Sequence, residues 1–241
     1  MTLLQTSAAT QSAPARAPTI TPPIKSLRLD FAPPADAEAL REFLLSDKKK
    51  EFDPQARVRP RSIKTITNAI EKGNLAYVSD NKGEYKALCM AYNQHHDPSK
   101  NMPSFSEVGS VLNLAQGLGL AKYIVTALAL KKTILENGQG PVIAKVAPDN
   151  AGAQKLFDLK LHWHKVSDFV QIGDYYNSSA STTINKDTHV HLRNWFEFLN
   201  EAQTAGRSLL QDTLANPLLI GRDGKRYELE VSDNIQRTLD L

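Results

Sequence analysis

A glycine-containing junction between a strand-like and a helix-like segment constrains this chain most. Residues 105–113 alternate in polarity, as in a strand. Beyond the junction, apolar residues recur at helical spacing: Ala121, Ile124, Val125, Leu128 and Leu135. A strand that turns through two glycines, Gly117 and Gly119, into a helix leaves backbone N–H groups free at the helix start. Such groups bind anions, so the junction predicts a site for a phosphate-bearing ligand.

Two common phosphate-binding patterns do not fit this junction. An NTPase loop ends in Gly-Lys-Ser/Thr, whereas Leu120 and Ala121 follow Gly119 here. A dinucleotide fingerprint needs a third glycine three positions after the second, where this chain has Lys122. The pattern that fits is Arg/Gln-x-x-Gly-x-Gly/Ala, with Gln116, Gly119 and Ala121 at its three defined positions.

That pattern resembles the pyrophosphate loop of the GNAT superfamily of acyl-CoA-dependent N-acetyltransferases. A second segment, Val142–Val146 followed by Asn150, Ala153 and Phe157, is similar to the family's fifth strand and its Asn-x-x-Ala-x-x-x-Tyr/Phe helix. The resemblance covers residues 26–171. It implies an α/β fold (an α+β mixed sheet flanked by helices), with acetyl-CoA as cosubstrate and an amine as acceptor.

Periodicity along residues 26–171 predicts the element order β-α-α-β-β-β-α-β-α-β, which the resemblance also implies. The elements outside the two motifs are a strand at 27–31, helices at 36–45 and 62–72, a hairpin of 75–78 with 85–92, and a last strand at 162–171. Gly73 is the expected C-terminal cap of the second helix, and residues 95–103 form a polar loop.

The resemblance assigns the catalytic base to Glu107, which would deprotonate the acceptor amine directly or through water. The alternative is an ordinary solvent-facing strand glutamate. The backbone around Leu112 and Asn113 would hold the thioester and the pantetheine amides. The stretch from Glu107 to Gln116 is shorter than is usual in the family, which leaves open which backbone groups face the pantetheine.

The remaining roles implied by the resemblance concern the cofactor phosphates and the leaving thiolate. The pyrophosphate would lie on the N–H groups of Gly117, Leu118, Gly119, Leu120, Ala121 and Lys122. Asn150 would contact the cofactor, and it is also a good helix N-cap. Phe157 stands where many relatives have a tyrosine that protonates the thiolate. Since phenylalanine cannot donate a proton, water or one of Tyr123, Tyr175 and Tyr176 would do so, or the fold no longer catalyses.

Composition indicates one enzyme-sized domain with appendages. The chain has 241 residues, 41% of them hydrophobic, and a formal charge of +3, which is too small to indicate nucleic acid or a membrane as a partner. The single cysteine, Cys89, excludes an internal disulfide and lies in an apolar run, so we interpret it as a core residue of a protein from a reducing, cytoplasmic compartment.

Histidine spacing raises the question of a metal site. All six histidines occur in pairs: His95 with His96, His162 with His164, and His189 with His191. No cysteine or carboxylate cluster at ligand spacing completes such a site, so we predict no metal. His95 or His96 is a secondary candidate for the general base.

Both ends of the chain lie outside the resemblance. Residues 1–25 are rich in Ser, Thr, Ala and Pro, so we expect a disordered tail. The tail is a plain extension, an organelle transit peptide, or the secretion signal of a bacterial effector. Residues 172–241 predict a helix at 190–205 and a hairpin of 218–220 with 227–231 around an Asp-Gly turn. We expect this extension to pack on the main domain, covering the acceptor side or forming a homodimer contact.

Two classes of function follow from the sequence. The first is an N-acetyltransferase that transfers an acetyl group from acetyl-CoA to a primary amine of a small molecule, peptide or protein. The second is a GNAT-fold binding module, or a secreted host-directed effector, that binds acyl-CoA or a partner protein without efficient turnover. The intact glycine loop favours the first class, and Phe157 keeps the second open.

Overall fold

A computed structural model describes residues 24–46, 62–94, 104–115, 117–135, 141–146, 149–166 and 194–241. The strands are β1 (Lys25–Phe31), β2 (Leu75–Asp80), β3 (Tyr85–Gln94), β4 (Phe105–Asn113), β5 (Val142–Val146), β6 (His164–Val166), β7 (Asn194–Glu197), β8 (Leu218–Ile220) and β9 (Arg226–Val231). The helices are α1 (Ala37–Leu45), α3 (Ile63–Glu71), α4 (Leu120–Leu135), α5 (Ala151–Lys155), α7 (Asn200–Ala215) and α8 (Asp233–Leu239), with a 3₁₀ turn at Pro34–Asp36 and a π-helical turn at Leu156–Lys160.

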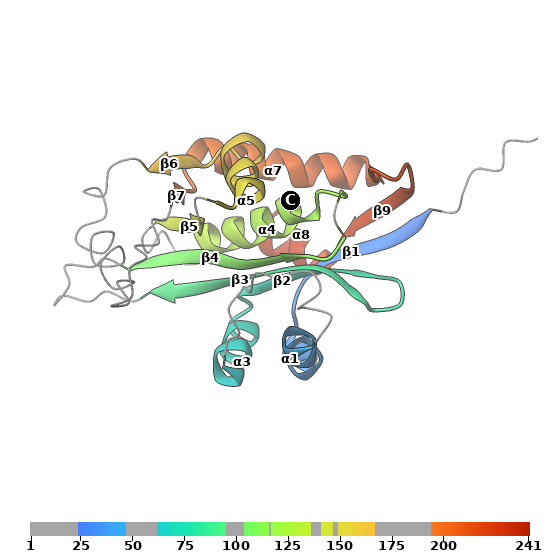
Figure 1. Ribbon diagram of the computed structural model, residues 1–241, viewed down its shortest axis with the longest axis horizontal. Coiled ribbons are helices and arrows are strands. Elements are labelled where there is room, and N and C mark those ends of the chain that lie inside the picture. Colours follow the sequence, from blue (N-terminus) through green and yellow to red (C-terminus); the bar gives the residue numbers. More distant parts are fainter. Residues whose placement is uncertain are drawn as a thin grey trace, which may run out of the picture.

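The strands form one mixed sheet in the order β6-β7-β5-β4-β3-β2-β1-β9-β8. β4 runs parallel to β5 and β1 runs parallel to β9, while the other neighbours are antiparallel. Figure 1 shows α1 and α3 on one face of the sheet and α4, α5, α7 and α8 on the other. The predicted fold class, a mixed sheet flanked by helices, is confirmed.

Each face of the sheet buries its own apolar cluster because strand side chains alternate between the faces. The cluster against α4, α7 and α8 includes Leu29, Val78, Cys89, Ile124, Leu210, Leu229 and Ile235. The cluster against α1 and α3 includes Leu40, Ile66, Ile70, Leu75, Leu88 and Met90. The Ser62 hydroxyl accepts a hydrogen bond from the Thr65 N–H and so caps the start of α3, and the helix ends at the predicted cap, Gly73, with φ +62°.

The C-terminal segment contributes to the same sheet. β9 pairs with β1 from Lys25↔Tyr227 to Leu29↔Val231, and β8 pairs with β9. α7 lies close to α4, since a β-carbon at Gly206 would stand 2.9 Å from Cγ2 of Thr126. Strand pairing and helix packing therefore fix the β8–β9 hairpin relative to α4.

The helix predicted at 190–205 is wrong at residues 194–197, which form β7 and pair with both β5 and β6. Residues 200–205 are helical as predicted, at the start of α7, and residues 190–193 lie outside the described part of the chain. Trp195 and Phe196 point to opposite faces and are both buried. This two-sided burial suits an interior strand, and the helical spacing of the apolar residues was coincidental.

The C-terminal helix α8 was not predicted at all. Its local signal is Ser232, whose hydroxyl accepts a hydrogen bond from the Ile235 N–H, followed by buried Ile235 and Leu239 one turn apart. The predicted last strand is described only as His164–Val166, and its remainder lies outside the described residues. The predicted tail also lies outside them, except that β1 includes Lys25.

Burial of β9 generates a stability prediction. Leu229 is fully buried between the β1 edge and α7, so Leu229→Ala removes apolar contacts and leaves a cavity. We expect a loss of about 2–5 kcal/mol in the free energy of unfolding, measured by denaturant titration. Glu228→Ala, on the exposed face of the same strand, should change that free energy by less than about 0.5 kcal/mol. Equal effects of the two variants would mean that β9 does not pack as described.

Candidate functional site

The site is built around the place where β4 and β5 part. The two strands pair only at Ser106↔Val142 and Glu107↔Ile143, although β4 continues to Asn113 and β5 to Val146. Beyond these pairs, the backbone edge of β4 that faces β5 has no strand partner among the described residues. An open strand edge presents N–H and C=O groups that can pair with an added extended segment, so this edge suits an amide-containing ligand that lies along it.

A β-bulge lies in the unpaired part of β4. Leu88 pairs with Leu112 and Met90 pairs with Gly109, so β4 has one more residue than β3 across this interval. Leu112 packs in the α1/α3 cluster, while Asn113 pairs with Ala87 and so shares its face under α4. The Asn113 Oδ1 atom is buried without a hydrogen-bond partner among the described residues. An amide N–H of a ligand in the gap would satisfy it.

The glycine junction lies between β4 and α4, as predicted. Gly117 has φ +90° and Gly119 has φ +68°, both in the left-handed region that glycine occupies without strain. Among the described residues, neither glycine N–H donates a hydrogen bond to the backbone. α4 begins at Leu120, so the N–H groups of Leu120 and Ala121 have no acceptor within the helix. The N–H groups of Leu118 and Lys122, also predicted to bind the phosphate, instead donate hydrogen bonds to the carbonyls of Ala115 and Gly119. The remaining N–H groups form a cradle at a helix N-terminus, suited to an anion.

The other predicted residues of the junction have different surroundings. Leu118 is partly buried against the apolar cluster under α4, α7 and α8. Leu120 is fully buried in the same cluster and anchors the start of α4. The Lys122 ammonium lies 4.6 Å from the centre of the Tyr123 ring, at the same helix end. Gln116 lies outside the described residues, so its predicted contact stays a prediction.

Sequence reasoning missed the second wall of this junction, which comes from the β8–β9 hairpin. A β-carbon at Gly117 would lie 3.2 Å from Cγ of Arg222, and one at Gly221 would lie 3.1 Å from Cδ2 of Leu118. The turn of the hairpin therefore touches the glycine cradle. No local pattern signals this contact, because it depends on β9 pairing with β1.

Glu107 lies at the point where the strands part, and it is held in an ion pair. Its Oε2 atom is 2.8 Å from Nζ of Lys145 on β5, and both side chains are about four-fifths buried. The Lys145 ammonium also lies 4.9 Å from the centre of the Trp195 ring. The ion pair requires an ionised Glu107, which is the form that accepts a proton. The partner Lys145 was not predicted.

Asn150 and Phe157 occupy the helix after β5. The Asn150 Oδ1 atom accepts a hydrogen bond from the Ala153 N–H, so the predicted N-cap is present and its Nδ2 group is left for another acceptor. Phe157 is 3% exposed, and its ring lies 4.9 Å from that of Trp163 and 5.6 Å from that of Phe196. The structure thus places Phe157 in the core, and its predicted contact with the cofactor stays a prediction.

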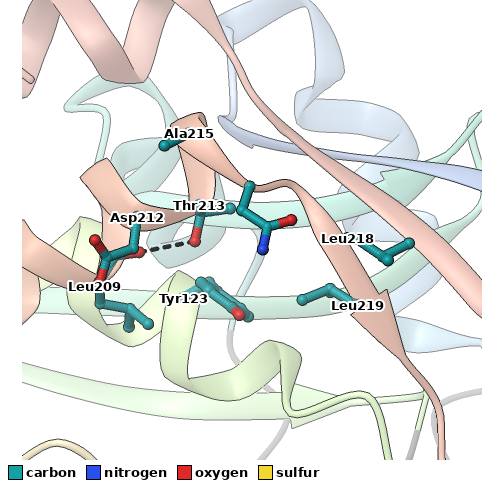
Figure 2. Close-up of a pocket in the computed structure, with 8 residues that line it drawn as sticks. Tyr123, Leu209, Asp212, Thr213, Ala215, Leu218 and Leu219 are labelled. Atoms are coloured by element: carbon teal, nitrogen blue, oxygen red, sulfur yellow. Dashed lines mark hydrogen bonds between the residues drawn. The ribbon is translucent and has the colours of Figure 1, made fainter.

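A separate pocket of about 380 Å³ lies between α4, the end of α7 and β8. Figure 2 shows Tyr123, Leu209, Thr213, Leu218 and Leu219 around it, with Asp212 at its rim. Among the described residues, Tyr123, a predicted candidate acid, lines it, and none of the residues predicted for the base or the cosubstrate does. Its charged lining residue is an acid, which disfavours phosphate, so the glycine cradle is the better anion site. Tyr123 faces this pocket, which lies toward β8 and not toward the gap beside β5.

Within the described ranges, no group of three or more His, Cys, Asp or Glu side chains could hold a metal ion. Four of the six histidines fall outside these ranges, and the two inside are His162 and His164. No helix in the described part of the chain is long and apolar enough to cross a membrane.

Burial of Cys89 generates a reactivity prediction. The thiol is inaccessible in the core beneath α4, and burial raises its pKa far above the usual value, so the reactive thiolate is suppressed. We expect a disulfide reagent such as DTNB to leave the native protein unlabelled at neutral pH and to label it fully in guanidinium chloride. Rapid labelling of the native protein would instead make Cys89 a candidate nucleophile.

Solved structures with a similar fold are acetyltransferases. An N-acetyltransferase from Staphylococcus aureus Mu50 is 14% identical, with a TM-score of 0.46 over 71% of this chain and 96% of its own. A diaminobutyrate acetyltransferase from Paenibacillus lautus, in complex with L-2,4-diaminobutyric acid and coenzyme A, is 13% identical, with a TM-score of 0.49 over 73% and 98%. A ribosomal-protein-alanine N-acetyltransferase from Brucella melitensis is 14% identical, with a TM-score of 0.46 over 70% and 97%. No protein-family model and no curated protein matches the sequence.

Proposed function

We propose that this protein is an acetyl-CoA-dependent N-acetyltransferase of the GNAT type, which acetylates a primary amine. One observation carries the proposal: the unpaired edge of β4 leads from Glu107 directly into the N–H cradle at the start of α4. This continuous path offers a base, a row of backbone hydrogen-bonding groups and an anion site in order. An acyl thioester, a diamide arm and a pyrophosphate follow one another in the same order in acetyl-CoA.

The residues present fit the cosubstrate. The N–H groups of Gly117, Gly119, Leu120 and Ala121 would hold the pyrophosphate, since the two left-handed glycines leave no β-carbon in the way. The β4 edge from Val108 to Asn113 would hydrogen-bond the pantetheine amides, and the orphaned Asn113 Oδ1 atom would accept one of their N–H groups. Acetyl-CoA supplies the activated acetyl thioester, and these residues of the protein hold that thioester in place.

Glu107 is the proposed general base. A primary amine has a pKa near 10.4, so removing its proton at neutral pH costs about 4–5 kcal/mol. A carboxylate at the acyl end of the path can accept that proton directly or through one water. The ion pair shows that this carboxylate already accommodates an alkylammonium group, that of Lys145, at 2.8 Å. An acceptor ammonium would share or replace this partner, which supports a primary amine as the acceptor class.

Departure of the thiolate does not depend on Phe157 in this proposal. Phe157 has no proton to give and is packed between Phe196 and Trp163. A thiol has a pKa near 8.5, so its anion is a good leaving group at neutral pH and water suffices to protonate it. Tyr123 faces the pocket on the other side of α4, and Tyr175 and Tyr176 lie outside the described residues.

A second candidate function is a binding module that holds acyl-CoA without efficient turnover. The observations that favour it are the core position of Phe157 and the engagement of Glu107 by Lys145. Turnover separates the two functions. Acetyl-CoA that binds but is not consumed with any amine, including polyamines, diamino acids and lysine peptides, would favour the module.

Glu107→Gln tests the proposed function. We expect turnover at neutral pH to fall about 10²- to 10⁴-fold, with acetyl-CoA binding unchanged, because the base is lost but the phosphate cradle is kept. The assay follows release of free thiol across pH 6 to 9. Glu228→Gln, an exposed strand glutamate on β9, is the matched control and should retain wild-type turnover.

Lys145→Met separates a chemical role of Glu107 from a structural one. This variant breaks the same ion pair but leaves the carboxylate in place, so it should retain far more activity than Glu107→Gln. If both variants lose activity equally, the ion pair is structural and Glu107 is not the base. Wild-type turnover in Glu107→Gln at every pH would refute the assignment as well.

A further inference from the structure

The β8–β9 turn places one cationic side chain against the glycine cradle. The aliphatic part of Arg222 lies along Gly117: a β-carbon at that glycine would be 3.2 Å from Cγ, 3.3 Å from Cβ and 3.3 Å from Cδ of Arg222. The guanidinium group is joined to Cδ, so it must lie close to the same loop. The side chain is exposed, and within the described residues its guanidinium makes no hydrogen bond or ion pair.

We propose that Arg222 is a phosphate-binding residue of the acetyl-CoA site, so that the C-terminal hairpin completes the cradle with a positive charge. The inference rests on the proposed function, because it concerns the same cosubstrate. It assigns the hairpin a role in binding the phosphorylated part of acetyl-CoA.

Electrostatics at the turn favour an anionic ligand. The neighbouring acid, Asp223, is engaged elsewhere: its Oδ2 atom lies 2.7 Å from Nζ of Lys225, and its Oδ1 atom accepts the Lys225 N–H at 3.1 Å. The negative charge of Asp223 is therefore neutralised by Lys225 within the turn. The positive charge of Arg222 has no acidic partner among the described residues. Cε of Lys122 lies 4.0 Å from the place of a β-carbon at Gly119. The side chains of two cationic residues thus lie beside the two glycines of the cradle.

The turn is held firmly enough to position this side chain. Gly221 donates its N–H to the Lys225 carbonyl and accepts the Gly224 N–H, both at 2.9 Å. Gly221 is itself buried against Leu118, and a β-carbon there would not fit. Since β9 is anchored on β1, little backbone conformational entropy remains to be lost when Arg222 binds. A guanidinium group also matches phosphate geometry through paired N–H donors.

Calorimetric titration of the full-length protein with acetyl-CoA tests the inference. We expect Arg222→Ala to weaken binding about tenfold or more, as for loss of a charged hydrogen bond, and Arg222→Lys to weaken it less. Arg237→Ala, which removes the same charge from the exposed face of α8, should bind like the wild type. Gly119→Glu, which puts a carboxylate in the cradle, should abolish binding. The variants should differ less at high salt, because screening weakens the attraction.

A second probe shows which part of the ligand Arg222 contacts. S-acetylpantetheine lacks the phosphates, so wild type and Arg222→Ala should bind it equally. Equal affinity of both proteins for acetyl-CoA would overturn the inference while leaving the proposed function in place. If the wild type does not bind acetyl-CoA, the proposed function fails. In that case titration with inorganic pyrophosphate tests the role of Arg222 separately. Weaker pyrophosphate binding by Arg222→Ala than by the wild type would support an anion site at Arg222, and equal or absent binding would overturn the inference.

Discussion

The parting of β4 from β5 after Glu107 is the constraint on which the site depends. Inside a sheet, an unpaired backbone edge costs about 1–3 kcal/mol for each buried group left without a partner. β4 and β5 are each paired on their other edge, with β3 and β7, while their facing edges part along the gap in the described chain. In the proposed function, the amides of the ligand take the place of the missing strand pairing, which is why an extended, amide-bearing molecule suits the gap.

The two ends of the gap are chemically distinct, which gives such a molecule a direction. One end carries the Glu107–Lys145 ion pair, and the other opens onto the N–H groups after Gly117. In the proposed complex, a ligand with a thioester at one end and phosphates at the other fits this gap in one orientation. Its thioester lies beside Glu107 and its phosphates lie on the N–H groups. The β-bulge in β4 and the buried Asn113 oxygen lie between them, where bulges commonly re-aim backbone groups at functional sites.

The C-terminal segment couples sheet stability to this site. β9 extends the sheet beyond β1, and its turn reaches back to the cradle at Gly117. A change that loosens β9, such as a cavity at Leu229, would therefore also disturb the wall that carries Arg222. Stability and ligand affinity should vary together along this hairpin more than along α1 or α3, which lie on the opposite face (Figure 1).

Local signals were enough to predict much of this fold from the sequence. Gly73, Gly117 and Gly119 adopt the left-handed conformations that their positions required, and Ser62 and Asn150 cap their helices. These features depend on a few neighbouring residues, so they can be read locally.

Features that depend on distant pairing could not be predicted. The apolar residues of β7 are spaced as in a helix, so this segment was predicted to be helical. It is a strand because it pairs with β5 and β6, which its own sequence does not reveal. The partner of Glu107 and the contact of Arg222 with Gly117 likewise join segments far apart in the chain. Phe157 was correctly expected on a helix, but its packing against Trp163 and Phe196 was not.

Amide chemical-shift mapping during titration with acetyl-CoA tests the central claim most directly. The largest shifts should fall on Gly117, Gly119 and residues 108–113 of β4, because the ligand would lie on the glycine N–H groups and along the edge of β4 that faces β5. Thr213 and Asn216, in the pocket beside α7, should move little. Shifts concentrated at that pocket, with the cradle and β4 unchanged, would contradict the assignment of the gap as the acetyl-CoA site.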